Sequence, residues 1–173
     1  MKNKITYKVK TIFLDFDGTL KLSDDVKGKV FYKIFGKKIL NSEKEKIFNH
    51  HKKNLGISRD KKIPIYMKYC NIKCNAFSKN FFLKKYSRIV KKKVFESKWV
   101  IGSKLFLKKN KHKNLILVTA SPHKEIVGIL KKTEIFKYFK EIYGYPYDKK
   151  IVIKNYIKKN KIDIESCLYI GNS

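Results

Sequence analysis

Arginine, cysteine and long apolar runs are scarce in this sequence of 173 residues. Of its 43 basic residues only Arg59 and Arg88 are arginines, which leaves 41 lysines. Nucleic-acid grooves favour the bidentate fork of arginine, and the lysines are spread along the whole chain. The net charge of +29 therefore indicates small anionic ligands, phosphates included, and argues against a nucleic-acid partner.

The few cysteines exclude a disulfide framework and favour a reducing compartment, so we expect a cytoplasmic protein. Cys70 and Cys74 follow His50 and His51, but the spacing lacks the second pair that a zinc site needs. No apolar run approaches the length of a membrane span, and the first run is too short and too interrupted by aspartates to resemble a signal peptide. The sequence predicts no membrane partner and leaves the oligomeric state open.

An apolar fraction of 43% with 12 Phe and 11 Tyr predicts a folded chain with one good core. Short continuous apolar runs followed by turns are typical of buried parallel strands, and helical periodicity lies between them. The predicted elements are strands at Val9–Phe16, Leu115–Val118, Glu141–Tyr143 and Cys167–Ile170, with helices at Pro122–Lys132 and Lys150–Lys159. This order predicts a doubly wound α/β fold with a parallel sheet.

The stretch from Leu22 to about Gly102 has helical periodicity and no strand-like run. Its helices are predicted at Asn41–Asn54 and around an apolar stripe from Phe82 to Val94. We therefore predict a core formed by residues 1–21 and 103–173, with a helical insert at residues 22–102 after the first strand.

Two aspartates follow the first predicted strand. Asp15 and Asp17 lie on the same side of an extended segment because side chains alternate along a strand, and Gly18 lets the chain turn. Ligands of open parallel sheets bind beyond the carboxyl ends of the strands. A pair of carboxylates suits Mg²⁺, and one carboxylate can attack phosphorus. We predict a magnesium-dependent phosphohydrolase with Asp15 as the nucleophile; a plain surface turn is the alternative for Asp-Gly-Thr alone.

Further polar residues follow the later strands. Thr119 closes the second strand, where its hydroxyl and nearby backbone N–H groups would hold a phosphate oxygen. Ser121 is the alternative donor, or simply a helix N-cap. Lys149, or its neighbour Lys150, precedes the last helix, where an ammonium would neutralise a phosphoryl group and orient Asp15.

Four segments together resemble the motifs of the haloacid dehalogenase superfamily. They are Asp15-Phe16-Asp17-Gly18-Thr19, Leu117-Val118-Thr119, Lys149, and Tyr169-Ile170-Gly171-Asn172-Ser173. The resemblance implies a Rossmann-like core in which Asp15 forms an aspartyl-phosphate. Asp17 would protonate the leaving group and then activate water. Mg²⁺ would be held by Asp15, by the backbone carbonyl of Asp17, and by Asn172.

The place of the insert resembles members with a helical cap, such as the phosphoglycolate phosphatase-like branch, in which the cap closes over small phosphorylated metabolites. Gly56-Ile57-Ser58-Arg59 followed by Lys62 resembles a cap segment of some members. Arg59 suits a substrate phosphate or carboxylate; an exposed helix-start arginine capped by Ser58 is the alternative. The expected substrate-binding residues are Gly18, Thr19, Ala120, Ser121, Arg59 and Lys62.

The fourth motif departs from the family pattern. Asn172 stands where an aspartate is usual, so it offers a metal an oxygen without negative charge, and the second acidic position is absent. We expect weaker metal binding and a chain truncated at its C-terminus. The predicted function is hydrolysis of a small phosphate monoester; the alternatives are a phosphomutase of the same superfamily, an inactive fragment, or a basic nucleic-acid-binding protein.

Overall fold

The computed structural model describes residues 9–172. Residues 1–8 and Ser173, which belong to the predicted core range, lie outside the described residues. The elements follow one another as β1 (Thr11–Leu14), α1 (Asp24–Lys33), α2 (Asn41–Lys53), α3 (Arg59–Tyr69), α4 (Ala76–Glu96), α5 (Ser103–Lys109), β2 (Asn114–Pro122), α6 (His123–Lys132), η1 (Phe136–Tyr138), β3 (Glu141–Tyr145), α7 (Lys149–Lys159), η2 (Ile164–Ser166) and β4 (Cys167–Ile170).

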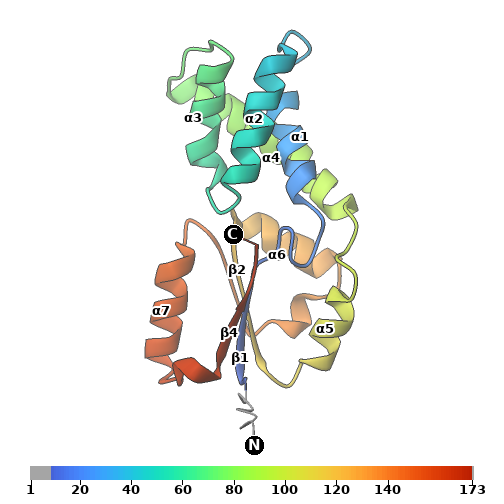
Figure 1. Cartoon of the computed structure of the whole chain (residues 1–173), viewed down its shortest axis with the longest axis vertical. Coiled ribbons are helices and arrows are strands. Elements are labelled where there is room, and N and C mark those ends of the chain that lie inside the picture. Colours follow the sequence, from blue (N-terminus) through green and yellow to red (C-terminus); the bar gives the residue numbers. More distant parts are fainter. Residues whose placement is uncertain (1–8, 173) are drawn as a thin grey trace, which may run out of the picture.

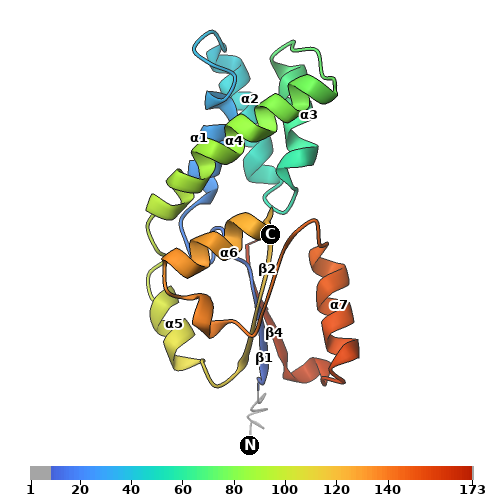
Figure 2. The same ribbon diagram turned by 180° about the vertical axis from the view of Figure 1, so that it is seen from behind.

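The four strands form one parallel sheet in the order β3-β2-β1-β4. All four residues of β1 are buried, because helices cover both faces of the sheet, with α5 and α6 on one face and α7 on the other (Figures 1 and 2). The predicted α/β fold with a parallel sheet is confirmed. Among the described helices, none has both the length and the apolar character needed to cross a membrane.

Alternating side chains divide the core between the two faces of the sheet. Ile12 and Leu117 belong to the larger cluster, which continues through α6 into the helices inserted after β1. Phe13 and Ile116 point the other way and pack with α7, where the rings of Phe13 and Tyr156 meet edge to face with centroids 5.7 Å apart. The continuous apolar runs therefore reflect burial on both faces.

Several boundaries differ from the predicted ones. β1 ends at Leu14 rather than at Phe16, because the carbonyl of Phe16 accepts hydrogen bonds from the backbone N–H groups of Leu20 and Lys21 and so closes a turn. β2 continues to Pro122, past an irregularity in its pairing with β3. The strand ends contain polar and small residues, so a prediction based on continuous apolar runs does not locate them.

Helices α1 to α4 form a separate layer beyond the carboxyl ends of the strands (Figure 1). Phe31, Tyr66 and Tyr86 are buried among these helices, and the rings of Phe31 and Tyr86 stack with centroids 4.2 Å apart. The chain enters and leaves this layer through two adjacent segments, because Lys21 forms an antiparallel bridge with Trp99. We call α1 to α4 the cap; it faces the edge of the sheet that carries the polar residues.

Candidate active site

Asp15 follows directly on β1 and is 4% exposed. One carboxylate oxygen, Oδ1, accepts a hydrogen bond from the backbone N–H of Phe16 at 2.7 Å, and Oδ2 lies 2.5 Å from the Nζ of Lys149. Lys149 is the first residue of α7, whose N-cap Asp148 accepts hydrogen bonds from the backbone N–H groups of Lys150 and Ile151. The helix start thus places one ammonium against the carboxylate, whereas Lys150 is exposed.

Asp17 is held by three side chains. Its carboxylate forms an ion pair with Lys27 and accepts hydrogen bonds from the hydroxyl groups of Ser23 at 2.5 Å and Ser121 at 3.1 Å. Lys27 also donates to the Ser121 hydroxyl at 2.7 Å, so this network joins the cap to β2. Burial raises the pKa of Asp17, but the Lys27 ammonium and the hydrogen bonds outweigh it and hold the pKa below its ordinary value. The carboxylate is therefore ionised at neutral pH.

Gly18 leaves room for two side chains that approach its Cα. Its φ of +67° is in the left-handed region, and a Cβ there would lie 2.0 Å from Nδ2 of Asn172 and 2.2 Å from Oδ2 of Asp24. These two side chains are bonded to each other, because the Asn172 amide donates to the Asp24 carboxylate at 2.7 Å. Glycine at position 18 therefore permits the close packing of the turn, α1 and the end of β4.

Asp24 was not among the predicted site residues. It lies in the first turn of α1, where acidic residues commonly interact with the helix dipole. This local role is enough to explain an aspartate at this position, so the sequence does not indicate that it lies beside Asp15 and Asp17. Burial and the charges of Asp17 and Asp15 raise its pKa, against the opposing effect of the Asn172 hydrogen bond. The Asp24 carboxylate thus lies in a partly buried position close to the carboxylates of Asp17 and Asp15.

These groups come from distant parts of the chain and line one small cavity of about 10 Å³. The side chains that line it are Asp15, Asp17, Asp24, Leu55, Ala120, Lys149 and Asn172. Within residues 9–172 no cluster of three or more His, Cys, Asp or Glu could hold a metal ion. Mg²⁺ is commonly bound through one or two carboxylates, with water and substrate oxygens completing its shell. The carboxylate of Asp15 and the amide oxygen of Asn172 fit that incomplete set of hard donors.

The remaining predicted residues near the sheet have different positions. Thr119 is buried, and its Oγ1 accepts a hydrogen bond from the backbone N–H of Ser121 at 3.2 Å. Neither Thr119 nor the partly exposed Thr19 lines the cavity. Ser121 is not the N-cap of α6, because Pro122 takes that position; its hydroxyl bonds to Asp17 instead. The structure thus brings Ala120 and Ser121, but not the two threonines, to the surface of the cavities.

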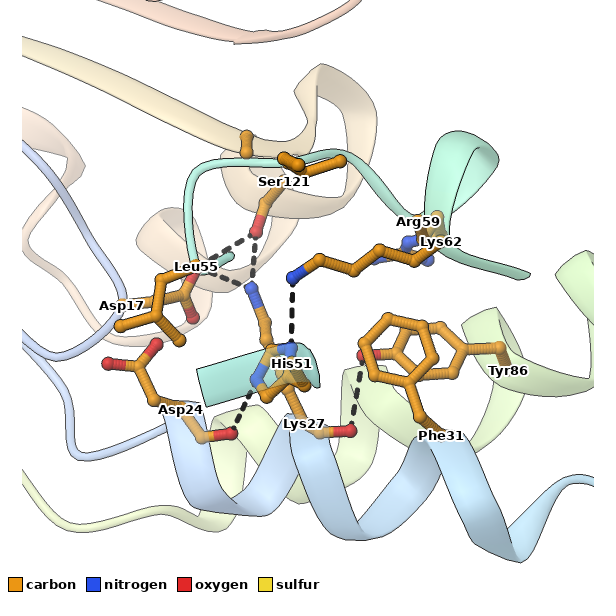
Figure 3. A pocket seen from close by; sticks show the side chains of 12 residues that line it. Asp17, Asp24, Lys27, Phe31, His51, Leu55, Arg59, Lys62, Tyr86 and Ser121 are labelled. Atoms are coloured by element: carbon orange, nitrogen blue, oxygen red, sulfur yellow. Dashed lines mark hydrogen bonds and ion pairs between the residues drawn. The ribbon is translucent and has the colours of Figure 1, made fainter. Parts of the chain in front are cut away.

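A second cavity of about 30 Å³ lies between Asp17 and the cap (Figure 3). Arg59 lines it but is 8% exposed, so the alternative of an exposed helix-start arginine is wrong. Its guanidinium binds both carboxylate oxygens of Glu125, on α6, at 2.9 and 2.8 Å, and donates to Ser87 at 2.7 Å. Arg59 thereby links cap helix α3 to the core.

Lys62 and His51 also line the second cavity. The Nζ of Lys62 lies 3.0 Å from Nδ1 of His51, and both side chains are buried. Burial and the nearby ammonium of Lys27 lower the pKa of Lys62 to about 7. Burial and the charge of Lys62 lower the pKa of His51 to about 3, so its ring is neutral. His51 was considered in the sequence only beside the cysteines, and no local pattern connects it to this cavity.

A scan against protein-family models found no match, and a search of curated proteins found none either. Solved structures do match. A haloacid dehalogenase-like hydrolase from Bacteroides fragilis has a TM-score of 0.73 at 18% identity, over 96% of this chain and 80% of its own. A predicted phosphoglycolate phosphatase from Haemophilus somnus has a TM-score of 0.71 at 18% identity, over 95% and 77%.

A structure named as a β-phosphoglucomutase from Thermotoga maritima is similar as well, with a TM-score of 0.64 at 18% identity, over 95% of this chain and 77% of its own. The chain therefore has the fold of haloacid dehalogenase-like hydrolases. The resemblance indicated by the sequence motifs is confirmed at the level of the fold.

Proposed function

We propose that this chain is a magnesium-dependent phosphatase that hydrolyses a small phosphate monoester through an aspartyl-phosphate on Asp15. The observation that carries the proposal is the setting of the Asp15 carboxylate. It lies at the carboxyl end of the central strand β1, between a backbone N–H and the Lys149 ammonium. Structures with this fold include phosphatases by name, which supports the same class of reaction here.

In the first step an Asp15 oxygen attacks phosphorus, and the bond from phosphorus to the ester oxygen breaks. A monoester that binds as its monoanion brings a proton, which Asp17 takes up and gives to the departing oxygen, so an alcohol leaves. Lys27 favours the ionised form of Asp17, and the negative charge of a bound phosphate opposes that effect and favours the protonated form. Lys149 compensates the charge that develops on the phosphoryl oxygens.

In the second step the ionised Asp17 takes a proton from water, and the resulting hydroxide attacks phosphorus. Inorganic phosphate leaves and the Asp15 carboxylate is restored. Mg²⁺ would be held by the Asp15 carboxylate, the Asp17 backbone carbonyl and the Asn172 amide oxygen, and would neutralise part of the phosphate charge. Because the amide carries no negative charge, we propose a weaker magnesium site than an aspartate would give.

The test is hydrolysis of p-nitrophenyl phosphate with and without magnesium. Asp15→Asn should reduce the rate to background, and removal of magnesium by EDTA should do the same to the wild-type chain. Asp25→Asn is the matched control, since Asp25 is exposed and pairs with Lys52. Equal rates for the wild type and Asp15→Asn would exclude the proposed function.

A phosphomutase is the second candidate, favoured by the likeness to the Thermotoga maritima structure. It would use the same aspartyl-phosphate but return the phosphoryl group to a sugar. Isomerisation of a sugar phosphate without release of inorganic phosphate would distinguish it from the phosphatase.

A further inference from the structure

Asn172 and Asp24 line the small cavity of about 10 Å³ beside the nucleophile Asp15. They come from different layers of the molecule, because Asn172 follows β4 in the sheet and Asp24 is the first residue of the cap helix α1. The Nδ2 of Asn172 donates a hydrogen bond to Oδ2 of Asp24 at 2.7 Å. This bond joins the cap to the end of β4 at the site of the proposed chemistry.

The turn after β1 provides the space for this contact. A Cβ on residue 18 would lie 2.0 Å from Nδ2 of Asn172 and 2.2 Å from Oδ2 of Asp24, which are the two atoms that form the bond. Any side chain at this position would therefore separate them. The bare Cα of Gly18 lets the amide and the carboxylate meet next to the motif that carries the nucleophile.

The hydrogen bond decides which atom of the Asn172 amide is available to a metal ion. A carboxylate can only accept hydrogen bonds, so the amide nitrogen must face Asp24. The amide oxygen is then left for another partner, and oxygen is the atom that a hard cation such as Mg²⁺ binds. If the amide were turned over, two oxygens would face each other. Asp24 therefore fixes the orientation that the proposed magnesium site requires.

Asp24 also brings a negative charge, which the Asn172 amide lacks. Asp15 and Asp17 each form an ion pair with a lysine. Within residues 9–172 no basic side chain forms an ion pair with Asp24, whose carboxylate has the Asn172 amide as its hydrogen-bond partner. Carboxylates that hold a metal ligand from the second layer commonly orient it and strengthen its bond to the metal. The charge of Asp24 is therefore placed to attract a cation at Asn172.

We propose that Asp24 is a positioning residue for magnesium binding, whose carboxylate orients the amide oxygen of Asn172 toward the metal ion and supplies the negative charge that the amide lacks. This inference rests on the proposed function for the presence of magnesium at Asp15. The amide and the carboxylate act together where a single carboxylate would otherwise suffice. Because Asp24 belongs to α1, the metal site depends on the cap as well as on the sheet.

The test is equilibrium binding of Mn²⁺, which takes the same oxygen ligands as Mg²⁺, measured from the electron paramagnetic resonance signal of the free ion. Competition by Mg²⁺ gives the magnesium affinity, and no substrate is present, so turnover does not enter the measurement. Asp24→Leu removes both the acceptor and the charge and should weaken binding about 10- to 100-fold. Asp24→Asn keeps an acceptor for the Asn172 amide and should weaken binding less. Asp25→Asn, at the exposed neighbour on α1 that pairs with Lys52, should bind as the wild type does.

Exchanging the two side chains separates this role from a merely structural one. In the chain with both Asp24→Asn and Asn172→Asp, the amide on α1 donates to a carboxylate after β4, so the hydrogen bond and the total charge are both kept. This chain should recover most of the affinity that Asp24→Asn loses. If Asp24→Leu does not fold, the comparison of Asp24→Asn with the exchanged chain carries the same test.

Three results would overturn the proposal. They are an unchanged affinity in a folded Asp24→Leu chain, an exchanged chain that binds no better than Asp24→Asn, and a wild-type chain that binds neither Mn²⁺ nor Mg²⁺. Failure of the phosphatase proposal shows separately, as absence of p-nitrophenyl phosphate hydrolysis by a wild-type chain that does bind magnesium.

Discussion

Replacing Lys62 by methionine should change how the stability of the protein depends on alkaline pH. The pKa of Lys62 is lowered from 10.5 to about 7 by its burial, and the side chain is 1% exposed. Between these two pH values the unfolded chain holds a proton on this lysine and the folded chain does not. The free energy of unfolding should therefore rise with pH through this window, by about 1.4 kcal/mol per pH unit.

Between pH 7.5 and 9.5 this single group should add about 2–3 kcal/mol to the free energy of unfolding. Methionine has no proton to lose, and its similar length lets it occupy the same space beside the Phe31 ring. The Lys62→Met chain should therefore lack the gain, and should be more stable than the wild type near pH 7.5. The other titrating groups are the same in both chains, so their contributions cancel in the comparison.

The assay is urea denaturation at several pH values between 7.5 and 9.5, with Lys61→Met as the matched control. Wild type and Lys61→Met should give parallel curves of stability against pH, and Lys62→Met should give a flatter one. Parallel curves for the wild type and Lys62→Met would refute the reasoning, because they would mean that Lys62 keeps an ordinary pKa in the folded chain.

Three further predictions follow from the cavity and its surroundings. Glu125→Gln should lower the free energy of unfolding, measured by urea denaturation, by about 3–5 kcal/mol, because it leaves Arg59 buried without its carboxylate partner. Adding Arg59→Met should recover much of that loss. An unchanged free energy of unfolding in Glu125→Gln would contradict the link between cap and core. The pKa of His51 is lowered from 6.5 to about 3, so between these values only the unfolded chain gains a proton on this ring. The free energy of unfolding of the wild type should therefore fall by about 2–3 kcal/mol as pH falls from 6.5 to 4.5. A His51→Asn chain with the same acid dependence would count against this. Gly18→Ala should lower phosphatase activity about 100-fold, because the new Cβ would lie 2.0 Å from Asn172 and 2.2 Å from Asp24. Gly36→Ala, at a φ of +94° and with open space around the new Cβ, should keep the wild-type activity. Equal activities of the two variants would contradict the close packing at Gly18.

The strand ends that carry the site were predictable from the sequence. The apolar run before Asp15 is buried on both faces of the sheet, so its continuity shows in the sequence, and Asp15 and Asp17 follow it directly. Lys149 was harder to separate from Lys150 among so many lysines. A signal that the prediction did not use is Asp148, a favourable N-cap whose side chain accepts hydrogen bonds from the backbone N–H groups of Lys150 and Ile151, so that Lys149 is the first helical residue.

The cap side of the site could not be predicted in the same way. The partner of Arg59 lies 66 residues away on α6, and a long-range pair of this kind leaves no local pattern. His51 and Asp24 belong to ordinary amphipathic helices, where a histidine or an acidic first turn has a sufficient local explanation. Only the packing of the cap against the sheet brings them beside Lys62 and Asp17.

The most direct test of the central claim is identification of the phosphorylated residue during turnover. The wild-type chain is mixed with magnesium and p-nitrophenyl phosphate, quenched in acid, digested, and analysed by mass spectrometry. The account predicts one phosphoryl group on Asp15 in the peptide that contains Asp15-Phe16-Asp17-Gly18, and none in the Asp15→Asn chain. Turnover with Asp15 unmodified, or a phosphoryl group that persists elsewhere in Asp15→Asn, would contradict it.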